Sequence, residues 1–503
     1  MNAKLDELRA RLGEIDDFNA AAGVLRWDQQ TYMPPAGAEG RAMQLATLSR
    51  TAHERLTADE IGVLLEDLEA ESATLDYDSF EASLIRVTRR RYDQLRRVPA
   101  RLVADLSRAR ALGNVAWQQA RADSDFAQFQ PHLERIVDLS IEKAEALGYE
   151  DRIYDALLDQ YEPQVKTAQV EVLFDEMKAG LVPLIREIAV REARAPIDDA
   201  LLRQEFDEGR QWEFGMEVLK RIGFDFSRGR QDRSAHPFTT GFGWGDTRLT
   251  TRLQATQLKA ALCASIHEAG HGMYRQGVER ALERTLLSGA SSLGVHESQS
   301  RMWENVVGRS RAFWSFWLPR LQAYFPTQLG GVDVDTFYRA VNRVRPSPIR
   351  VEADEVTYNL HIFIRFEIEN LMVERRVKVG ELPELWNAKM EEYLGFRPEN
   401  NAEGVLQDTH WSGGMIGYFP TYSLGNLLAV QFYRQAVAER PDIPAQIEAG
   451  EFEPLLSWMR SHIHIHGAKY TPTELVQRVT GGPIHSQPFL DYVREKYTRV
   501  YGL

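Results

Sequence analysis

The stretch His267-Glu268-Ala269-Gly270-His271 (HEAGH) lies within residues that have the apolar spacing of a long amphipathic helix. Histidines four residues apart share one face of a helix, so both imidazoles can reach one metal ion. The glutamate between them projects close by and can take a proton from an attacking water molecule. The stretch therefore predicts a helix that carries a metal-hydrolase site.

A catalytic zinc site with two histidines needs a third protein ligand and one open position for water. Glu297 follows His271 at the spacing expected for a helix, a connecting loop and a second antiparallel helix. His296 is the rival ligand, but neighbouring residues on a helix do not face one metal ion together. Gly272–Gly277 offers no third histidine. We therefore expect Glu297 to complete the site.

The composition of the chain is that of a globular protein with a large core. It has 503 residues, 44% hydrophobic and 26% charged, with a net charge of -13 that disfavours nucleic acids and anionic membranes as partners. Cys263 is its one cysteine, so no intramolecular disulfide can form and a reducing compartment is favoured. Residues 1–18 lack the apolar core of a signal peptide, and no stretch approaches the ~20 apolar residues of a membrane helix. We expect a cytoplasmic protein, in which Cys263 is a small packed residue rather than a metal ligand.

Most of the chain has helical periodicity. Leu5, Leu8, Leu12 and Ile15 open a first helix, and residues 84–95 and 133–147 show the same spacing, with Gly148 as a stop signal. Trp27-Asp28 and Met33-Pro34-Pro35 predict a turn after the first helix. There are no fixed-period repeats and no long Gly/Ser linker, so the sequence predicts a single, mostly α-helical domain over residues 1–503.

Two segments have a different pattern. Residues 236–252 (HPFTTGFGWGDTRLTTR) have the composition of a short β-hairpin or edge strand. Such an edge could align a substrate backbone as an added strand, although a purely structural turn would have a similar composition. His462, His464 and His466 have the period of a strand, but they follow an apolar helical pattern and precede Gly467. We interpret them as packing and capping residues at a helix end.

Several motifs occur in an order that resembles the carboxypeptidase Taq family. They are His236-Pro237-Phe238, Asp246-Thr247-Arg248-Leu249-Thr250, HEAGH, His296-Glu297-Ser298-Gln299, Ile349-Arg350-Val351-Glu352-Ala353-Asp354, Gly404-Val405-Leu406-Gln407-Asp408-Thr409-His410-Trp411, and the shorter Leu25-Arg26-Trp27-Asp28 and Ile465-His466-Gly467. The resemblance covers essentially the whole chain. It implies a gluzincin-like helical fold, similar to neurolysin and angiotensin-converting enzyme. It also implies a deep groove with a small hairpin beside the active site, and residues 1–100 are a candidate helical cap over that groove.

The resemblance implies His267, His271 and Glu297 as metal ligands and Glu268 as the general base. One divalent metal ion per chain is expected, with zinc favoured and cobalt or manganese open, because such ligands suit all three.

An exopeptidase must also recognise a free C-terminal carboxylate, for which a planar, permanently charged arginine is suited. Arg350 and Arg248 are the candidates, and the resemblance favours Arg350. Asp246 is expected to hold Arg248 in place.

The oxyanion of the reaction needs neutral or cationic donors. His236 and His410 are the candidate histidines. Tyr418 is a candidate phenolic donor, and Tyr422 is a candidate for the same role or for substrate binding.

The leading hypothesis is a metallocarboxypeptidase of broad side-chain specificity that removes single residues from peptides with a free C-terminus. An endo-acting zinc oligopeptidase on the same scaffold is one alternative. A catalytically silent, metal-stabilised helical binding protein is the other, and the intact Glu268 argues against it because structural zinc sites need no base. The resemblance also implies a homodimer.

Overall fold

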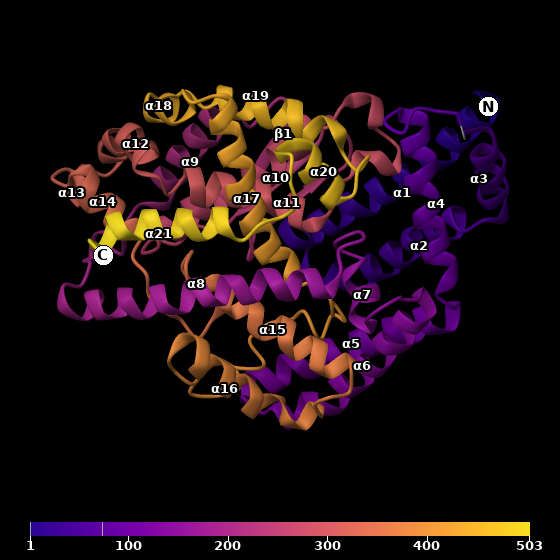
Figure 1. Ribbon diagram of the computed structural model, residues 1–503, viewed down its shortest axis with the longest axis horizontal. Coiled ribbons are helices and arrows are strands. Elements are labelled where there is room, and N and C mark those ends of the chain that lie inside the picture. Colours follow the sequence, from indigo (N-terminus) through magenta and orange to yellow (C-terminus); the bar gives the residue numbers. More distant parts are fainter. Residues whose placement is uncertain (1, 73) are drawn as a thin grey trace.

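Helices make up most of the protein, as predicted. The computed structural model describes residues 2–72 and 74–503, where three short strands accompany the helices. Figure 1 shows α10, α11 and α17 in the middle of the molecule, with the remaining helices around them. Within the described ranges, no helix is long and apolar enough to cross a bilayer.

The first four helices form a group at one end of the molecule (Figure 1). They are α1 (Asn2–Thr31), α2 (Ala38–Leu56), α3 (Asp59–Ser72) and α4 (Phe80–Arg97). Their apolar side chains form a hydrophobic cluster of their own, which Val278, Leu282 and Leu287 also enter. The turn prediction was wrong for Trp27-Asp28, because α1 continues to Thr31, and right for the residues around Pro34 and Pro35.

The next helices build the larger core. They are α5 (Ala100–Asp123), α6 (Phe126–Leu147), α7 (Ile153–Leu158), α8 (Thr167–Arg194) and α9 (Glu208–Ile222). In α6 the predicted apolar face is buried, and Gly148 caps the helix at φ +83°. A fully buried aliphatic side chain of this kind stabilises the fold by about 1.5–3 kcal/mol.

A small three-stranded sheet precedes the HEAGH helix. Its strands are β1 (Gly229–Arg233), β2 (Thr239–Gly241) and β3 (Thr247–Thr251), in the order β1-β3-β2. β2 and β3 pair antiparallel, which confirms the predicted hairpin. β1 pairs parallel to β3 and was not predicted, since its sequence GRQDR lacks the β-branched and aromatic residues typical of strands.

The HEAGH motif lies on α10 (Leu258–Gly277), and Glu297 lies on α11 (Leu293–Arg301). Two glycines allow the close packing of these helices. A Cβ on Gly270 would lie 2.6 Å from the Gln299 carbonyl oxygen, and one on Gly425 would lie 2.5 Å from Glu297 Cγ. α10 and α17 (Pro420–Glu439) therefore approach α11 from two sides and fix the position of Glu297.

A π-helix, Met302–Val307, continues directly from α11. Its wider turn is marked by the Gly308 amide, which donates to the Trp303 carbonyl five residues earlier at 2.8 Å. Such widened turns are frequent at functional sites because they redirect side chains.

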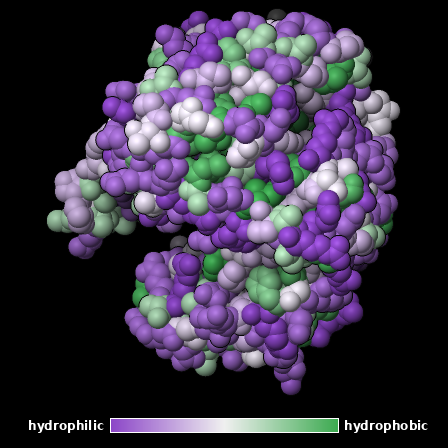
Figure 2. Space-filling model, turned by 90° about the vertical axis from the view of Figure 1, so that its left-hand side faces the viewer, coloured by the Kyte–Doolittle hydropathy of each residue, from purple (hydrophilic) through white to green (hydrophobic). Residues whose placement is uncertain are grey.

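The remaining helices complete the body of the protein around α17. They are α12 (Arg311–Tyr324), α13 (Pro326–Leu329), α14 (Val334–Val341), α15 (Tyr358–Val373), α16 (Leu382–Leu394), α18 (Ile443–Glu448), α19 (Glu453–His462), α20 (Pro472–Thr480) and α21 (Gln487–Tyr501). Figure 2 shows one face of the molecule deeply hollowed between two masses, with apolar residues visible along the hollow.

The three closely spaced histidines near the C-terminus have packing roles, as predicted. His462 ends α19 and stacks on Trp458 at a ring distance of 4.5 Å. His464 is buried, with Nε2 2.9 Å from Gln299 Oε1, and His466 lies edge-on to Tyr470.

Candidate active site

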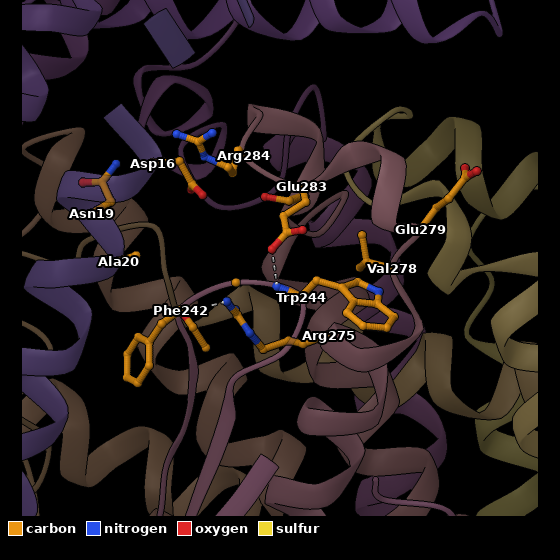
Figure 3. Close-up of a pocket in the computed structure, with 13 residues that line it drawn as sticks. Asp16, Asn19, Ala20, Phe242, Trp244, Arg275, Val278, Glu279, Glu283 and Arg284 are labelled. Carbon is orange, nitrogen blue, oxygen red and sulfur yellow. Dashed lines mark hydrogen bonds between the residues drawn. The ribbon is translucent and has the colours of Figure 1, made fainter. Parts of the chain in front are cut away.

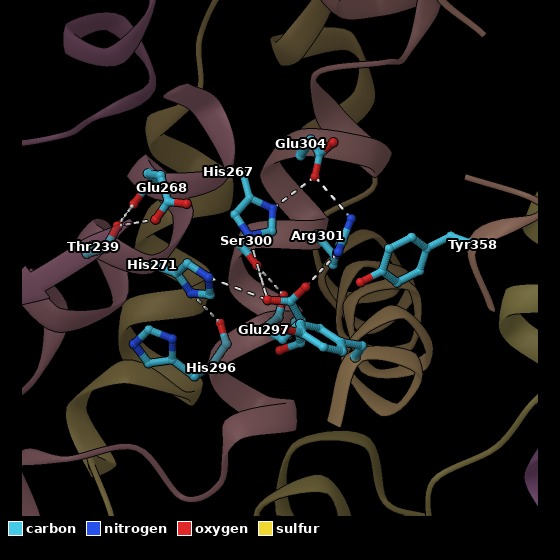
Figure 4. Close-up of polar contacts among 12 residues, drawn as sticks. Thr239, His267, Glu268, His271, His296, Glu297, Ser300, Arg301, Glu304 and Tyr358 are labelled. Atoms are coloured by element: carbon cyan, nitrogen blue, oxygen red, sulfur yellow. Dashed lines mark hydrogen bonds and ion pairs between the residues drawn. The ribbon is translucent and has the colours of Figure 1, made fainter. Parts of the chain in front are cut away.

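His267, His271 and Glu297 meet between α10 and α11 (Figure 4). Glu297 Oε2 lies 3.7 Å from His267 Nε2 and 3.4 Å from His271 Nε2. One ligand atom from each residue lies within 4.8 Å of the others, a triangle that one metal ion can bridge. Two imidazole nitrogens and one carboxylate oxygen are the donor set of a catalytic zinc site.

Both imidazoles are oriented through their second nitrogen. His267 Nδ1 lies 2.9 Å from Glu304 Oε2, and His271 Nδ1 lies 3.0 Å from the His296 carbonyl oxygen. Because these oxygens accept, Nδ1 donates and Nε2 is left free to face Glu297. The His296 ring stacks on His271 instead of joining the triangle.

Arginines surround the carboxylates of the site. Arg301 Nε donates to Glu297 Oε1 at 2.6 Å, and its Nη1 lies 3.3 Å from Glu304 Oε2. Arg309 donates to Glu304 Oε1 at 2.5 Å. Burial alone would raise the pKa of Glu297, but the opposing interactions, led by the charge of Arg301, hold this pKa well below its usual value. Glu297 is therefore ionised, as a metal ligand must be.

Glu268 lies between the two histidines in sequence, and its side chain lines the cleft beside them. The hydroxyl of Thr239, on the edge strand β2, lies 2.6 Å from Glu268 Oε2 and 2.9 Å from the Glu268 carbonyl oxygen. This contact fixes the carboxylate against the sheet.

A buried cationic group lies in the same cleft as the histidines. Arg350 donates to Asp408 Oδ1 from Nε at 3.1 Å and from Nη2 at 2.8 Å. Arg365 donates to the other oxygen of Asp408 at 2.6 Å. Two guanidiniums share one carboxylate, so the group keeps one net positive charge. Arg350 Nη1 donates to the Tyr358 hydroxyl at 2.9 Å.

His410, Tyr418 and Tyr422 pack together beside this group. His410 Nε2 lies 3.2 Å from the Tyr422 hydroxyl. Burial lowers the pKa of His410 to about 4, so its imidazole is neutral at neutral pH. Of the three residues, Tyr422 is the one that lines the cleft.

Three candidate residues lie away from the ligand triangle. Arg248 forms a bidentate ion pair with Asp246, with both hydrogen bonds at 2.9 Å. Its guanidinium carbon lies 4.2 Å from the ring centroid of Trp27 on α1. His236 is exposed on the loop between β1 and β2, next to Pro237, which lines the cleft.

The cleft has a volume of about 850 Å³ and is open to solvent. Cys263 lies in its wall, half-buried, one helical turn before His267. The packed position predicted for Cys263 is therefore only partly right, because one side of the residue faces the cleft.

Sequence reasoning missed the residues that orient the ligands and the arginine. They are Thr239, Arg301, Glu304, Arg309, Tyr358 and Arg365. Glu304 lies seven residues after Glu297, a spacing that recurs on one helical face and could have drawn attention to it. Asp408 lies inside a quoted motif but was given no role.

Comparison with known proteins places the whole chain in one group. The model of the carboxypeptidase Taq (M32) metallopeptidase family matches residues 7–497. Thermostable carboxypeptidase 1 of Thermus thermophilus is 42% identical over 96% of both chains. Carboxypeptidase 1 of Bacillus subtilis is 36% identical over 98% of this chain and 97% of its own. The crystal structure of an M32 carboxypeptidase from Deinococcus radiodurans covers 100% of both chains with a TM-score of 0.96 at 38% identity.

Proposed function

The chain belongs to the carboxypeptidase Taq (M32) metallopeptidase family of metal-dependent carboxypeptidases, and we propose that His267, His271 and Glu297 hold its metal ion, with zinc as the native metal. The observation that carries this proposal is the ligand triangle in one cleft with the net positive group of Arg350. The ligand triangle would supply the hydrolytic chemistry, and the positive group of Arg350 would select a substrate with a free carboxylate.

Glu268 acts as the general base and then as the general acid. A divalent ion held by the triangle would lower the pKa of bound water toward about 7 and polarise the scissile carbonyl. Glu268 takes the proton of the attacking water and delivers it to the leaving amine. Its contact with Thr239 supports this role, because the hydroxyl holds one carboxylate oxygen while the other remains available.

Arg350 binds the substrate's terminal carboxylate. Asp408 fixes the plane of its guanidinium, and the Tyr358 hydroxyl accepts a hydrogen bond from Nη1 of the same guanidinium. The second guanidinium, that of Arg365, preserves a net positive charge that attracts an anion into a buried site. This arrangement favours exopeptidase action over cleavage inside a chain.

The oxyanion receives its hydrogen bond from Tyr422, which lines the cleft, while the neutral His410 sets the direction of the phenol. Tyr418 packs against both rings and keeps them in place. His236 contributes from the rim once a peptide is bound.

Arg248 and Asp246 have a structural role. Their pair holds Trp27 of α1 against the hairpin. The peptide main chain lies along the edge strand β2, because Thr239 brings that strand into contact with the catalytic glutamate.

The decisive experiment is a peptide ladder with the zinc-loaded protein and its Glu268→Gln variant. We expect the wild-type protein to release one residue at a time, and the variant to retain zinc while trimming at least about 10³-fold more slowly. Unchanged trimming by the variant would remove Glu268 from the mechanism.

A peptide pair tests the direction of attack. The substrate with a free C-terminus should be cleaved, and its C-terminally amidated twin should lose most of the activity, since the amide gives Arg350 no charge to bind. Equal cleavage of both peptides at internal bonds would identify an endopeptidase.

A further inference from the structure

A second cavity lies outside the catalytic cleft, where the N-terminal helices meet the body of the protein (Figure 3). It has a volume of about 220 Å³ and is lined by α1, by the turn between β2 and β3, and by the end of α10 with the segment that follows it. Val278 in its wall belongs to the core of α1–α4, so the cavity lies at the seam between the two hydrophobic clusters.

Asp16 and Arg275, two charges of opposite sign, line this cavity without a direct ion pair, and they attract one another only at longer range. Within residues 2–72 and 74–503, no hydrogen bond or ion pair engages the Asp16 carboxylate, and Arg275 makes a single side-chain hydrogen bond, to the Gly241 carbonyl at 3.2 Å. By contrast, Arg284 in the same wall is paired through two nitrogens with Asp17. In Figure 3, Asp16 lies on the opposite side of the cavity from Arg275.

The surroundings of these two charges are poorly solvated. Burial raises the pKa of Asp16, and burial lowers the pKa of Arg275. Withdrawing a charge from water without pairing it costs free energy, which a ligand of complementary charge would recover.

The walls of the cavity have a fixed shape. A Cβ on Gly241 would lie 2.4 Å from Arg275 Nε, so the guanidinium rests directly on the glycine backbone. Gly243 adopts φ +147°, which only glycine takes readily. The Trp244 ring contacts the guanidinium of Arg228 at 4.1 Å, and its backbone amide donates to Glu283 at 3.0 Å.

We propose that this cavity binds one free α-amino acid. Its carboxylate would pair with Arg275, and its ammonium group would pair with Asp16 on the opposite side of the cavity. Its side chain would lie beside Ala20 and Val278, the aliphatic residues of the lining. The volume suits a single residue.

Such a ligand would connect the N-terminal helices to the catalytic helix. Asp16 lies on α1, and Arg275 lies on α10 one turn after His271. This regulatory consequence rests on the proposed function, because a carboxypeptidase releases free amino acids. The product would then adjust activity from outside the cleft.

Binding can be measured by calorimetry in an Arg350→Met background, which removes the carboxylate site of the cleft. We expect L-phenylalanine to bind with one equivalent per chain. Phenylalaninamide, which lacks the carboxylate, and N-acetylphenylalanine, which lacks the ammonium group, should each bind at least tenfold more weakly.

Variants assign the binding to the cavity. Adding Arg275→Met or, separately, Asp16→Asn should weaken binding of L-phenylalanine at least tenfold. Adding Arg284→Met is the matched control, because that arginine lines the same cavity but is already paired, and it should leave the affinity unchanged. Thermal unfolding and zinc content of each variant show that the fold and the metal site are intact.

The proposal is overturned if no free amino acid binds at up to about 10 mM. It is also overturned if the Arg275 and Asp16 variants bind as well as the Arg284 control. These binding measurements do not depend on peptide hydrolysis. The proposed function is tested separately by the peptide ladder, so a failure of one proposal can be told from a failure of the other.

Discussion

Glu304 connects His267, the proposed metal ligand, to the protein around it. Its two carboxylate oxygens contact His267 on one side and Arg301 and Arg309 on the other. We expect Glu304→Gln to lower zinc affinity about 10–100-fold, because the amide orients the imidazole less firmly and withdraws the negative charge that makes it basic.

Competition with a chromophoric chelator measures this change. Glu355→Gln is a matched control, since Glu355 is a buried carboxylate that lines the same cleft but pairs with Lys496. The control should lose stability and keep its zinc affinity. Equal losses of affinity in both variants would contradict a specific role for Glu304.

The two candidate arginines can be separated by substitution. Arg350→Met should lower kcat/KM about 30-fold or more, since losing one partner of a buried charge pair costs about 2–5 kcal/mol. The preference for free over amidated peptides should fall with it. Arg248→Met should keep that preference and lower the melting temperature, because Arg248 braces Trp27. If Arg248→Met lost the preference for free peptides and Arg350→Met kept it, Arg248 would be the residue that binds the carboxylate.

Some of this site could be predicted from single residues, and some could not. The spacing of His267 and His271 follows from local helix geometry, and the short connection to the next helix placed Glu297 within reach of them. The pairing of Arg350 with Asp408 joins positions 58 residues apart, which no local pattern encodes. The same holds for Thr239 and Glu268, which come from different elements.

The N-terminus of α11 depends on a buried acid. Glu162 accepts the Gly294 amide at 2.5 Å and is 1% exposed, and burial raises its pKa to about 8. Its folded-state pKa lies above that of the unfolded chain, near 4.3. Its stabilising contribution is therefore complete below about pH 4.3 and is lost as pH rises through about 8.

Glu162→Gln keeps a neutral side chain of the same shape at every pH. The stability of the wild-type protein relative to this variant should fall by roughly 1 kcal/mol per pH unit between about pH 5 and about pH 8. Urea unfolding of both proteins across that range measures the difference. A difference that does not change with pH would mean that Glu162 is already ionised in the folded protein.

At the level of elements, periodicity was reliable for long helices and less so for short segments. α6 follows its apolar spacing because one face packs on the core. β1 escaped prediction because its pairing with β3 outweighs its poor strand composition. α1 runs past Trp27 because that side chain is buried against the rest of the protein, a tertiary contact that local turn signals do not contain.

For the whole molecule, the metal ion should contribute stability as well as activity. The ligand triangle joins α10 to α11, and it is available only in the folded chain. We expect a chelator to abolish peptide trimming and to lower the melting temperature, and added zinc to restore both. At a free zinc concentration about 100 times Kd, the gain is about 3 kcal/mol.

Scanning calorimetry at several zinc concentrations tests this expectation, with calcium as a control ion that prefers a larger number of oxygen ligands. A melting temperature that does not depend on zinc would show that the ion has no preference for the folded chain, and would contradict a zinc site at the triangle. Activity that survives complete removal of metal would contradict the mechanism itself.

The π-helix at Met302–Val307 has an evolutionary consequence. A π-turn contains one residue more than an α-turn, so deleting a single codon there would restore α-helical geometry. The side chains within the window would then point in other directions relative to α11, and Glu304 would lose its contacts with His267 and Arg309. We therefore expect selection in this lineage to preserve the number of codons in this window as strictly as the kinds of residue they encode.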